Sequence, residues 1–157
     1  KPITETQIII GKYLAILSLW LFIFVLTYIY FIVVKHFSLS NAPIDVGASY
    51  GSYIGLFFLG AVFAAIGLFS SAITNNTIVA FILGVFLSYL MYDAFFRLST
   101  LPIFSGSIDY WIQYFGLGAH YESVSRGVID SRDIIYFISI IAMFLILSKT
   151  SIESRKW

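Results

Sequence analysis

Few residues in this chain have side chains that could do chemistry, and their spacing excludes the common nucleotide-binding and thiol motifs. A phosphate-binding loop ends in Gly-Lys followed by Ser or Thr, with a further glycine five residues earlier. Here Tyr13 follows Gly11-Lys12, and no glycine stands five residues before Gly11. The chain contains no cysteine, which excludes disulfides, thiolate catalysis and cysteine-based metal sites. We therefore expect this chain to bind no cofactor.

The histidines and serines do not form a recognisable catalytic or metal-binding motif either. His36 and His120 are the only histidines, and neither has the i, i+4 partner of a helical metal pair. We interpret each as an interfacial or capping residue. Ser131 and Asp133 lie close together without a histidine nearby in the sequence, although neighbours in space are not visible at this level. An intramembrane hydrolase is therefore a hypothesis with little support, and we predict no catalytic or metal-binding residues.

Asp93 and Arg97 form the one ion pair expected near an apolar segment. They are four residues apart, so they can meet on one face of a helix. Charges deep in lipid are costly and usually functional, whereas pairs at headgroup level are ordinary. Counted from Asn75 the two residues fall near the outer headgroups, which favours an interfacial pair, but their depth stays open.

Composition places the chain in a membrane. Of its 157 residues, 60% are hydrophobic and 11% are charged, and the mean hydropathy is +0.95. This balance is far from that of soluble domains. The net charge of +1 provides no basic face for a nucleic acid. We predict an integral membrane protein whose surroundings are the lipid bilayer, with no nucleic-acid partner.

Long uncharged runs predict four membrane-spanning helices. No charged residue lies between Lys12 and Lys35, and none from Val46 to Tyr92. One crossing needs about 20 apolar residues, so the second run holds two antiparallel spans that turn at Asn75. A shorter run near the end of the chain supplies the last span. The predicted fold is an all-α polytopic membrane protein, a single transmembrane domain over 1–157 with spans at about 8–35, 50–73, 77–98 and 132–152.

Basic residues suggest which side each end of the chain occupies. Lysine and arginine accumulate on the cytoplasmic side of membrane proteins. With four spans, one side holds Lys1, Lys12, Lys149, Arg155 and Lys156, and the other holds Lys35, Arg97, Arg126 and Arg132. The difference is small, but it favours an even number of spans with both termini in the cytoplasm.

Two short external helices are predicted between the third and fourth spans. In the first, at about 107–115, Ser107 is the expected cap and Gly116 and Gly118 end the helix. The second, at about 119–127, places Glu122 one turn before Arg126 and ends at Gly127. The first helix has an apolar stripe suited to the membrane surface, formed by Ile108, Trp111, Ile112 and Phe115.

Two further patterns concern the beginnings of the first two spans. Thr4 and Gln7 have the spacing of a capping box, so a helix should begin at about Thr4 and continue into the first span. Gly47, Gly51 and Gly55 lie four residues apart on one helix face, where small residues let two helices approach closely. Whether this face meets a helix of the same chain or a second subunit stays open.

Two stretches and the end of the chain resemble a known transporter family. The sequence from Pro2 to Thr4, followed by Ile8 to Tyr13, resembles the segment after the cytoplasmic coupling helix in permeases of the ABC-2 exporter family. The stretch from His120 to Asp133 and the ending Glu153 to Trp157 resemble, more narrowly, the permease subunit of the gliding-motility ABC transporter. Such permeases usually have six spans, so we expect this chain to correspond to the last four.

The resemblance implies a function and a set of partners. It implies the membrane subunit of an ATP-driven exporter in a bacterial inner membrane, paired with a second permease subunit and with separate ATPase subunits that bind ATP and Mg²⁺. It places the ATPase contact at Lys1, Pro2, Ile3 and Thr4, and the translocation path along Phe81, Val85, Ser88 and Tyr92. It also implies that the external helices dip back toward the bilayer. The alternative is a non-transporting membrane scaffold in a motility or envelope complex.

Overall fold

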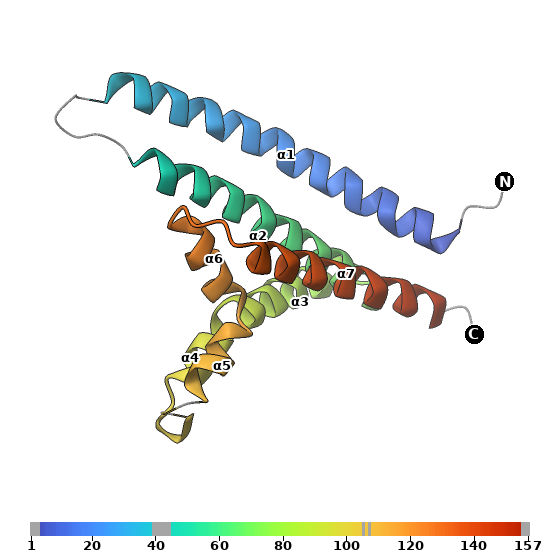
Figure 1. The fold of residues 1–157 in the computed structure, drawn as a ribbon. Coiled ribbons are helices and arrows are strands. Elements are labelled where there is room, and N and C mark those ends of the chain that lie inside the picture. Colours follow the sequence, from blue (N-terminus) through green and yellow to red (C-terminus); the bar gives the residue numbers. More distant parts are fainter. Residues whose placement is uncertain (1–3, 39–44, 105, 107, 155–157) are drawn as a thin grey trace.

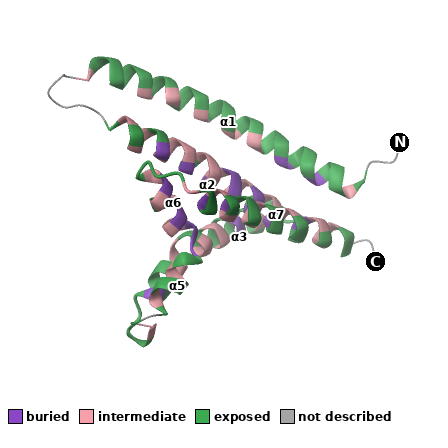
Figure 2. Cartoon of the chain, in the orientation of Figure 1, coloured by how far each residue is buried: buried purple, intermediate pink, exposed green. Residues whose placement is uncertain are grey.

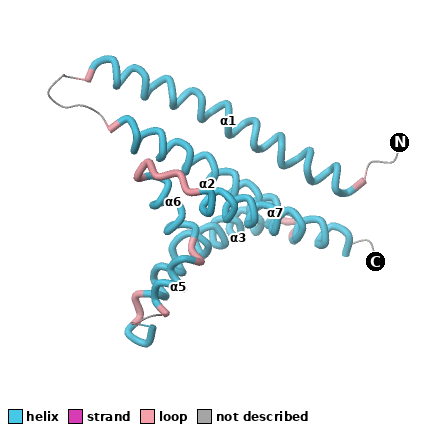
Figure 3. Tube along the Cα trace, in the orientation of Figure 1, coloured by secondary structure: helices cyan, strands magenta, loops and turns pink. Residues whose placement is uncertain are grey.

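The chain folds into helices that gather around one central helix. A computed structural model describes residues 4–38, 45–104, 106 and 108–154. Within these ranges all regular structure is helical, as predicted (Figure 3). In chain order the elements are α1 (Glu5–Phe37), α2 (Val46–Ile73), α3 (Thr77–Tyr89), the π-helical η1 (Leu90–Ala94), α4 (Phe95–Ser99), the short 3₁₀ turn η2 (Pro102–Phe104), α5 (Asp109–Tyr114), α6 (Leu117–Ser125) and α7 (Ser131–Ser154) (Figure 1).

Four helical stretches are long and apolar enough to cross a membrane. They are Glu5–Phe37, Val46–Ile73, Thr77–Ser99 and Ser131–Ser154. The third combines α3, η1 and α4 into one continuous helical path. Each stretch contains one of the four predicted spans, so the number and order of spans are confirmed. The N-terminal end of α1 and the C-terminal end of α7 lie on the same side of the helix bundle, as an even number of crossings requires (Figure 1).

Side chains at the predicted turns fix where these helices begin. The backbone N–H of Gln7 donates a hydrogen bond to the Thr4 hydroxyl, and the backbone N–H of Thr4 donates one to Gln7 Oε1. These two bonds confirm the predicted capping box. Asn76 Oδ1 accepts from the N–H groups of Ile78 and Val79 at the start of α3. These bonds satisfy amide hydrogens that have no partner inside the helix.

The second span begins one turn earlier than predicted. Asp45 Oδ1 accepts a hydrogen bond of 3.0 Å from the Ala48 N–H, so α2 begins at Val46 and not near residue 50. The prediction had assigned Asp45 to the preceding loop. A carboxylate at this position caps the free amides and also interacts favourably with the positive end of the helix.

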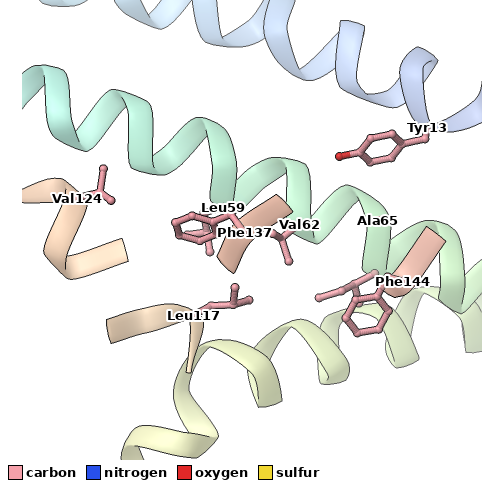
Figure 4. Close-up of a cluster of buried hydrophobic side chains, with 9 residues drawn as sticks. Tyr13, Leu59, Val62, Ala65, Leu117, Val124, Phe137 and Phe144 are labelled. Carbon is pink, nitrogen blue, oxygen red and sulfur yellow. The ribbon is translucent and has the colours of Figure 1, made fainter. Parts of the chain in front are cut away.

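The core lies around α2, which contacts α1, α3, α6 and α7. Buried residues of α2 meet α6 and α7 on one side and α1 on the other (Figure 4). Hydrogen bonds fasten the neighbours: the Tyr13 hydroxyl donates to the Ala61 carbonyl, and the Ser151 hydroxyl donates to the Ala72 carbonyl. Bonds of this kind, together with close packing, hold helices together where lipid removes the hydrophobic driving force.

Most large apolar side chains point outward instead of into this core. Along α1 only Ile9 and Tyr13 are buried, and its apolar residues face outward on most of its circumference (Figure 2). A helix that is apolar all round needs an apolar environment on every side. This distribution agrees with helices that contact lipid.

Candidate functional site

The short helix α6 lies against the glycine face of α2. A Cβ atom on Gly51 would lie 2.7 Å from the Gly127 Cα and still closer to the Val124 carbonyl oxygen, and one on Gly55 would lie 3.2 Å from the Tyr121 ring. The Ser52 hydroxyl also donates to the Ser125 carbonyl, at 3.2 Å. The sequence left the partner of this face open. In the structure the partner is a helix of the same chain.

Gly127 ends this segment in the left-handed region and touches the start of α2. Its φ is +87°, and a Cβ atom on it would lie 2.9 Å from the Gly47 carbonyl carbon. Only glycine adopts this conformation without cost, and only glycine fits this close to another backbone. The predicted helix end at Gly127 is therefore confirmed, and Gly47 joins Gly51 and Gly55 in the contact.

The second predicted external helix begins earlier than expected. The break was expected to include Gly118, but Gly116 precedes α6 and Gly118 lies within it. A Cβ atom on Gly118 would come within 2.8 Å of the Tyr92 carbonyl oxygen in η1. Gly118 is therefore a packing residue that lets α6 touch the third span, and the prediction that it ends a helix is wrong.

A buried histidine–aspartate pair joins α6 to the start of α7. His120 Nδ1 lies 2.6 Å from Asp133 Oδ1, and the two side chains are 1% and 5% exposed. The other ring nitrogen, Nε2, lies 2.9 Å from the Tyr114 carbonyl oxygen. The imidazole also stacks on the Tyr136 ring, with centroids 3.8 Å apart. We name the buried His120–Asp133 pair, together with the Tyr114 carbonyl and the Tyr136 ring that contact it, the buried polar cluster.

The hydrogen-bond geometry restricts the protons that the pair can carry. Both ring nitrogens face oxygen atoms, and the Tyr114 carbonyl can only accept. Nε2 must therefore carry a hydrogen, and one further hydrogen must lie between Nδ1 and Asp133. Asp133 Oδ2 is buried and has no hydrogen-bond partner within the described part of the chain.

The prediction for His120, an interfacial or capping residue, is confirmed only in part. Its Nε2 donates a hydrogen bond to the carbonyl of Tyr114, the last residue of α5, which is a capping contact. The side chain is nevertheless almost fully enclosed between α5, α6 and α7, and the sequence did not predict this burial. At the start of α7, Asp130 Oδ1 accepts a hydrogen bond of 2.9 Å from the Arg132 N–H, and Asp133 lies in the first turn of the helix. In the sequence, the only indication of this cluster is that His120 and Asp133 stand at the two ends of the stretch that resembles the gliding-motility permease.

A groove between α2 and α3 collects three of the four predicted path residues. Its volume is about 600 Å³. Phe81, Val85 and Ser88 line it from α3, while Phe63, Gly67 and Ser71 line it from α2. Tyr92 does not belong to this groove. It lies in a separate pocket of about 340 Å³ beside α6, together with Asp93 and Glu122.

The remaining predicted contacts are local. Arg97 pairs with Asp93, and Arg126 Nη2 lies 2.8 Å from Glu122 Oε1. Both are i, i+4 pairs, as predicted, and both arginine side chains are 69% exposed. Because each carboxylate has an arginine partner, the pocket beside α6 has little net charge.

The structure describes the external stripe but only one residue of the proposed ATPase contact. Trp111 and Phe115 of the stripe are exposed and Ile112 is half-buried, so the apolar side faces away from the protein. The expected cap, Ser107, lies outside the described residues, as do Lys1, Pro2 and Ile3. Thr4, the fourth predicted contact residue, lies at the exposed N-terminal tip of α1.

No group of three or more histidine and acidic side chains in the described ranges is placed to hold a metal ion. Comparison of the chain with protein-family models, with curated proteins and with solved structures finds no match. The function of this chain is therefore inferred from its geometry and from the sequence resemblance.

Proposed function

We propose that this chain is the membrane-spanning permease subunit of an ABC-2-type, ATP-driven exporter, associated with gliding motility in a bacterial inner membrane. Both chain ends face the cytoplasm. A second permease subunit completes the membrane part, and separate ATPase subunits bind ATP and Mg²⁺. The chain itself is a transport subunit, not an enzyme.

One observation carries this proposal: after the third span, α5 packs back on α4, and α6 then lies against α2 before the last span begins. Gly51 and Gly55 receive α6 on the half of α2 away from the chain ends. The resemblance implies the same layout, with short external helices that dip toward the bilayer ahead of a final span. The order of four spans and the shared position of the chain ends also support it (Figure 1).

The form of α1 supports a mechanical role in such a transporter. A transporter of this kind must convert closure of its cytosolic subunits into movement of membrane helices, which requires a stiff lever. α1 runs without interruption from Glu5 to Phe37 and is capped at Thr4. Its first turn would receive the force, and its contacts with α2 and α7 would transmit it to the bundle.

The buried polar cluster argues against the hydrolase hypothesis. A catalytic histidine needs a free ring nitrogen to accept a proton from a serine. In His120 one nitrogen faces Asp133 and the other faces the Tyr114 carbonyl, so neither is available to Ser131. We assign the cluster a structural role: it anchors α6 to the start of the last span.

Purification from native membranes tests the proposal. The chain, tagged at one end, should co-purify with a nucleotide-binding subunit whose ATP turnover falls when this chain is removed. A stable complex that contains no nucleotide-binding subunit would instead support the scaffold in a motility or envelope complex.

A further inference from the structure

The α2–α3 groove has the length of one membrane leaflet. It follows α2 from Phe63 to Thr74 and α3 from Thr77 to Ser88. At 1.5 Å per residue, each wall is roughly 16 Å long. The hydrocarbon core of a bilayer is about 30 Å thick, so the groove reaches from the turn at Asn75 to about the midplane.

Polarity changes along the groove as it does along a lipid. Thr74, Asn75 and Thr77 line the end at the turn, where headgroups would lie. Farther along, the walls carry the apolar side chains of Phe63, Phe81 and Val85, and the polar lining is reduced to the hydroxyls of Ser71 and Ser88. A ligand that fits this lining has a polar end and a hydrocarbon chain, because apolar walls favour burial of an apolar chain and polar groups fix its orientation.

Two glycines create the space. Gly84 packs on α2, where a Cβ atom would lie 3.5 Å from the Ser70 hydroxyl oxygen. Gly67 is different, because a Cβ atom there would have no neighbour within 4 Å. Helix packing therefore does not require a glycine at this position. Its missing side chain keeps the groove deep.

We propose that the groove binds the acyl chain of a phospholipid-like amphiphile, with the polar end at Thr74–Thr77 and the chain end near Ser88. The leaflet is the one on the side of the chain ends, since Lys12 of α1 and Ile152 of α7 lie together beside the end of α2. This deepens the proposed function by naming the kind of molecule that the path residues take, and it rests on that function for the membrane placement.

Photolabelling with two lipids tests the site. The full chain is reconstituted into phosphatidylethanolamine–phosphatidylglycerol vesicles that contain phosphatidylethanolamine with a diazirine either near the carbonyl or at the end of one acyl chain. The first probe should label residues 74–77 and the second residues 85–88, as located by mass spectrometry. Labelling in the reverse order, or at the same place by both probes, would contradict the proposed orientation.

Matched glycine variants separate a built site from general lipid contact. Gly67→Leu fills the groove and should lower labelling there by about tenfold, which corresponds to ~1.4 kcal/mol. Gly11→Leu adds the same side chain to an open position on α1 and should leave groove labelling unchanged. Val85→Trp fills the groove from α3 and provides a second test if Gly67→Leu does not fold.

Two results would overturn the inference. In one, labelling spreads over the outward face of α1 as strongly as over the groove and does not respond to either filling variant. In the other, neither probe labels the groove in the reconstituted protein, so that a second copy of the chain, and not a lipid, fills it. If the groove is not labelled but an ATPase still co-purifies, the lipid site is refuted and the proposed transporter function is not. If the groove is labelled but no ATPase co-purifies, the transporter function is refuted and the lipid site is not.

Discussion

Removing one partner of the buried His120–Asp133 pair should destabilise the protein far more than removing both. In His120→Phe an aromatic ring can keep the stacking on Tyr136, but Asp133 loses the partner of Oδ1. Its other oxygen has no hydrogen bond within the described chain, so the carboxylate would be buried without any partner that the structure shows. In the double variant with Asp133→Leu, no carboxylate remains.

The size of the effect follows from burial. With side chains 1% and 5% exposed, solvent cannot replace the lost interaction. Breaking one side of a buried pair costs about 3–5 kcal/mol, whereas replacing the whole pair by apolar residues is often nearly neutral. We therefore expect His120→Phe to lower the free energy of unfolding by roughly that amount, and the double variant to recover most of it.

Reversible unfolding of the purified protein in mixed micelles measures this difference, and a double-mutant cycle gives the coupling. Glu122→Gln is the matched control, because it breaks an exposed pair on the same helix and should change stability little. The reasoning is refuted if His120→Phe changes the free energy of unfolding no more than Glu122→Gln does. It is also refuted if the double variant is less stable than both single variants.

Three further predictions concern the packing, the external helices and the path. Gly51→Ala should lower the stability of the protein by about 1–3 kcal/mol, because the new Cβ meets the backbone of Val124 and Gly127. The control Gly11→Ala adds the same group where no neighbour lies within 4 Å and should not lower stability. Equal melting temperatures for the two variants would contradict the packing role of Gly51. Trp111→Glu should impair assembly, because it places a charge on the stripe that faces the membrane; labelling that finds residue 111 freely water-accessible in the assembled protein would count against this placement. If the proposed permease dimer forms, single cysteines at 81, 85 or 88, in a chain without native cysteine, should cross-link its two subunits. Failure at all three positions would remove these residues from the proposed path.

The spans were predictable because each is specified locally. Uncharged runs set their number, and the capping residues Thr4 and Asn76 set two of their starts. Asp45 is a cap of the same kind, but the second span was predicted to begin at about residue 50, which left Asp45 outside it. The π-helical turn at Leu90–Ala94 has no local signature in the sequence, and it was not predicted.

The buried polar cluster was not predictable, because it depends on contacts between distant segments. His120 is buried because residues of α5 and α7 enclose it, among them Tyr114, Asp133 and Tyr136. Spacing rules describe neighbours on one helix, whereas His120 and Asp133 lie on different helices joined through a turn at Gly127. The groove has the same origin, since Gly67 and Gly84 gain their meaning from how α2 and α3 pair.

The most direct test of the central claim is whether nucleotide moves α1. In the complex purified with its ATPase subunits, spin labels on cysteines at 10 and 73 report the distance between the start of α1 and the end of α2. The account predicts that trapping with ATP and vanadate changes this distance, and that a Gly-Gly insertion between Gln7 and Ile8 abolishes the change while ATP hydrolysis continues. An unchanged distance in the complex without the insertion, with nucleotide bound and hydrolysis intact, would contradict it.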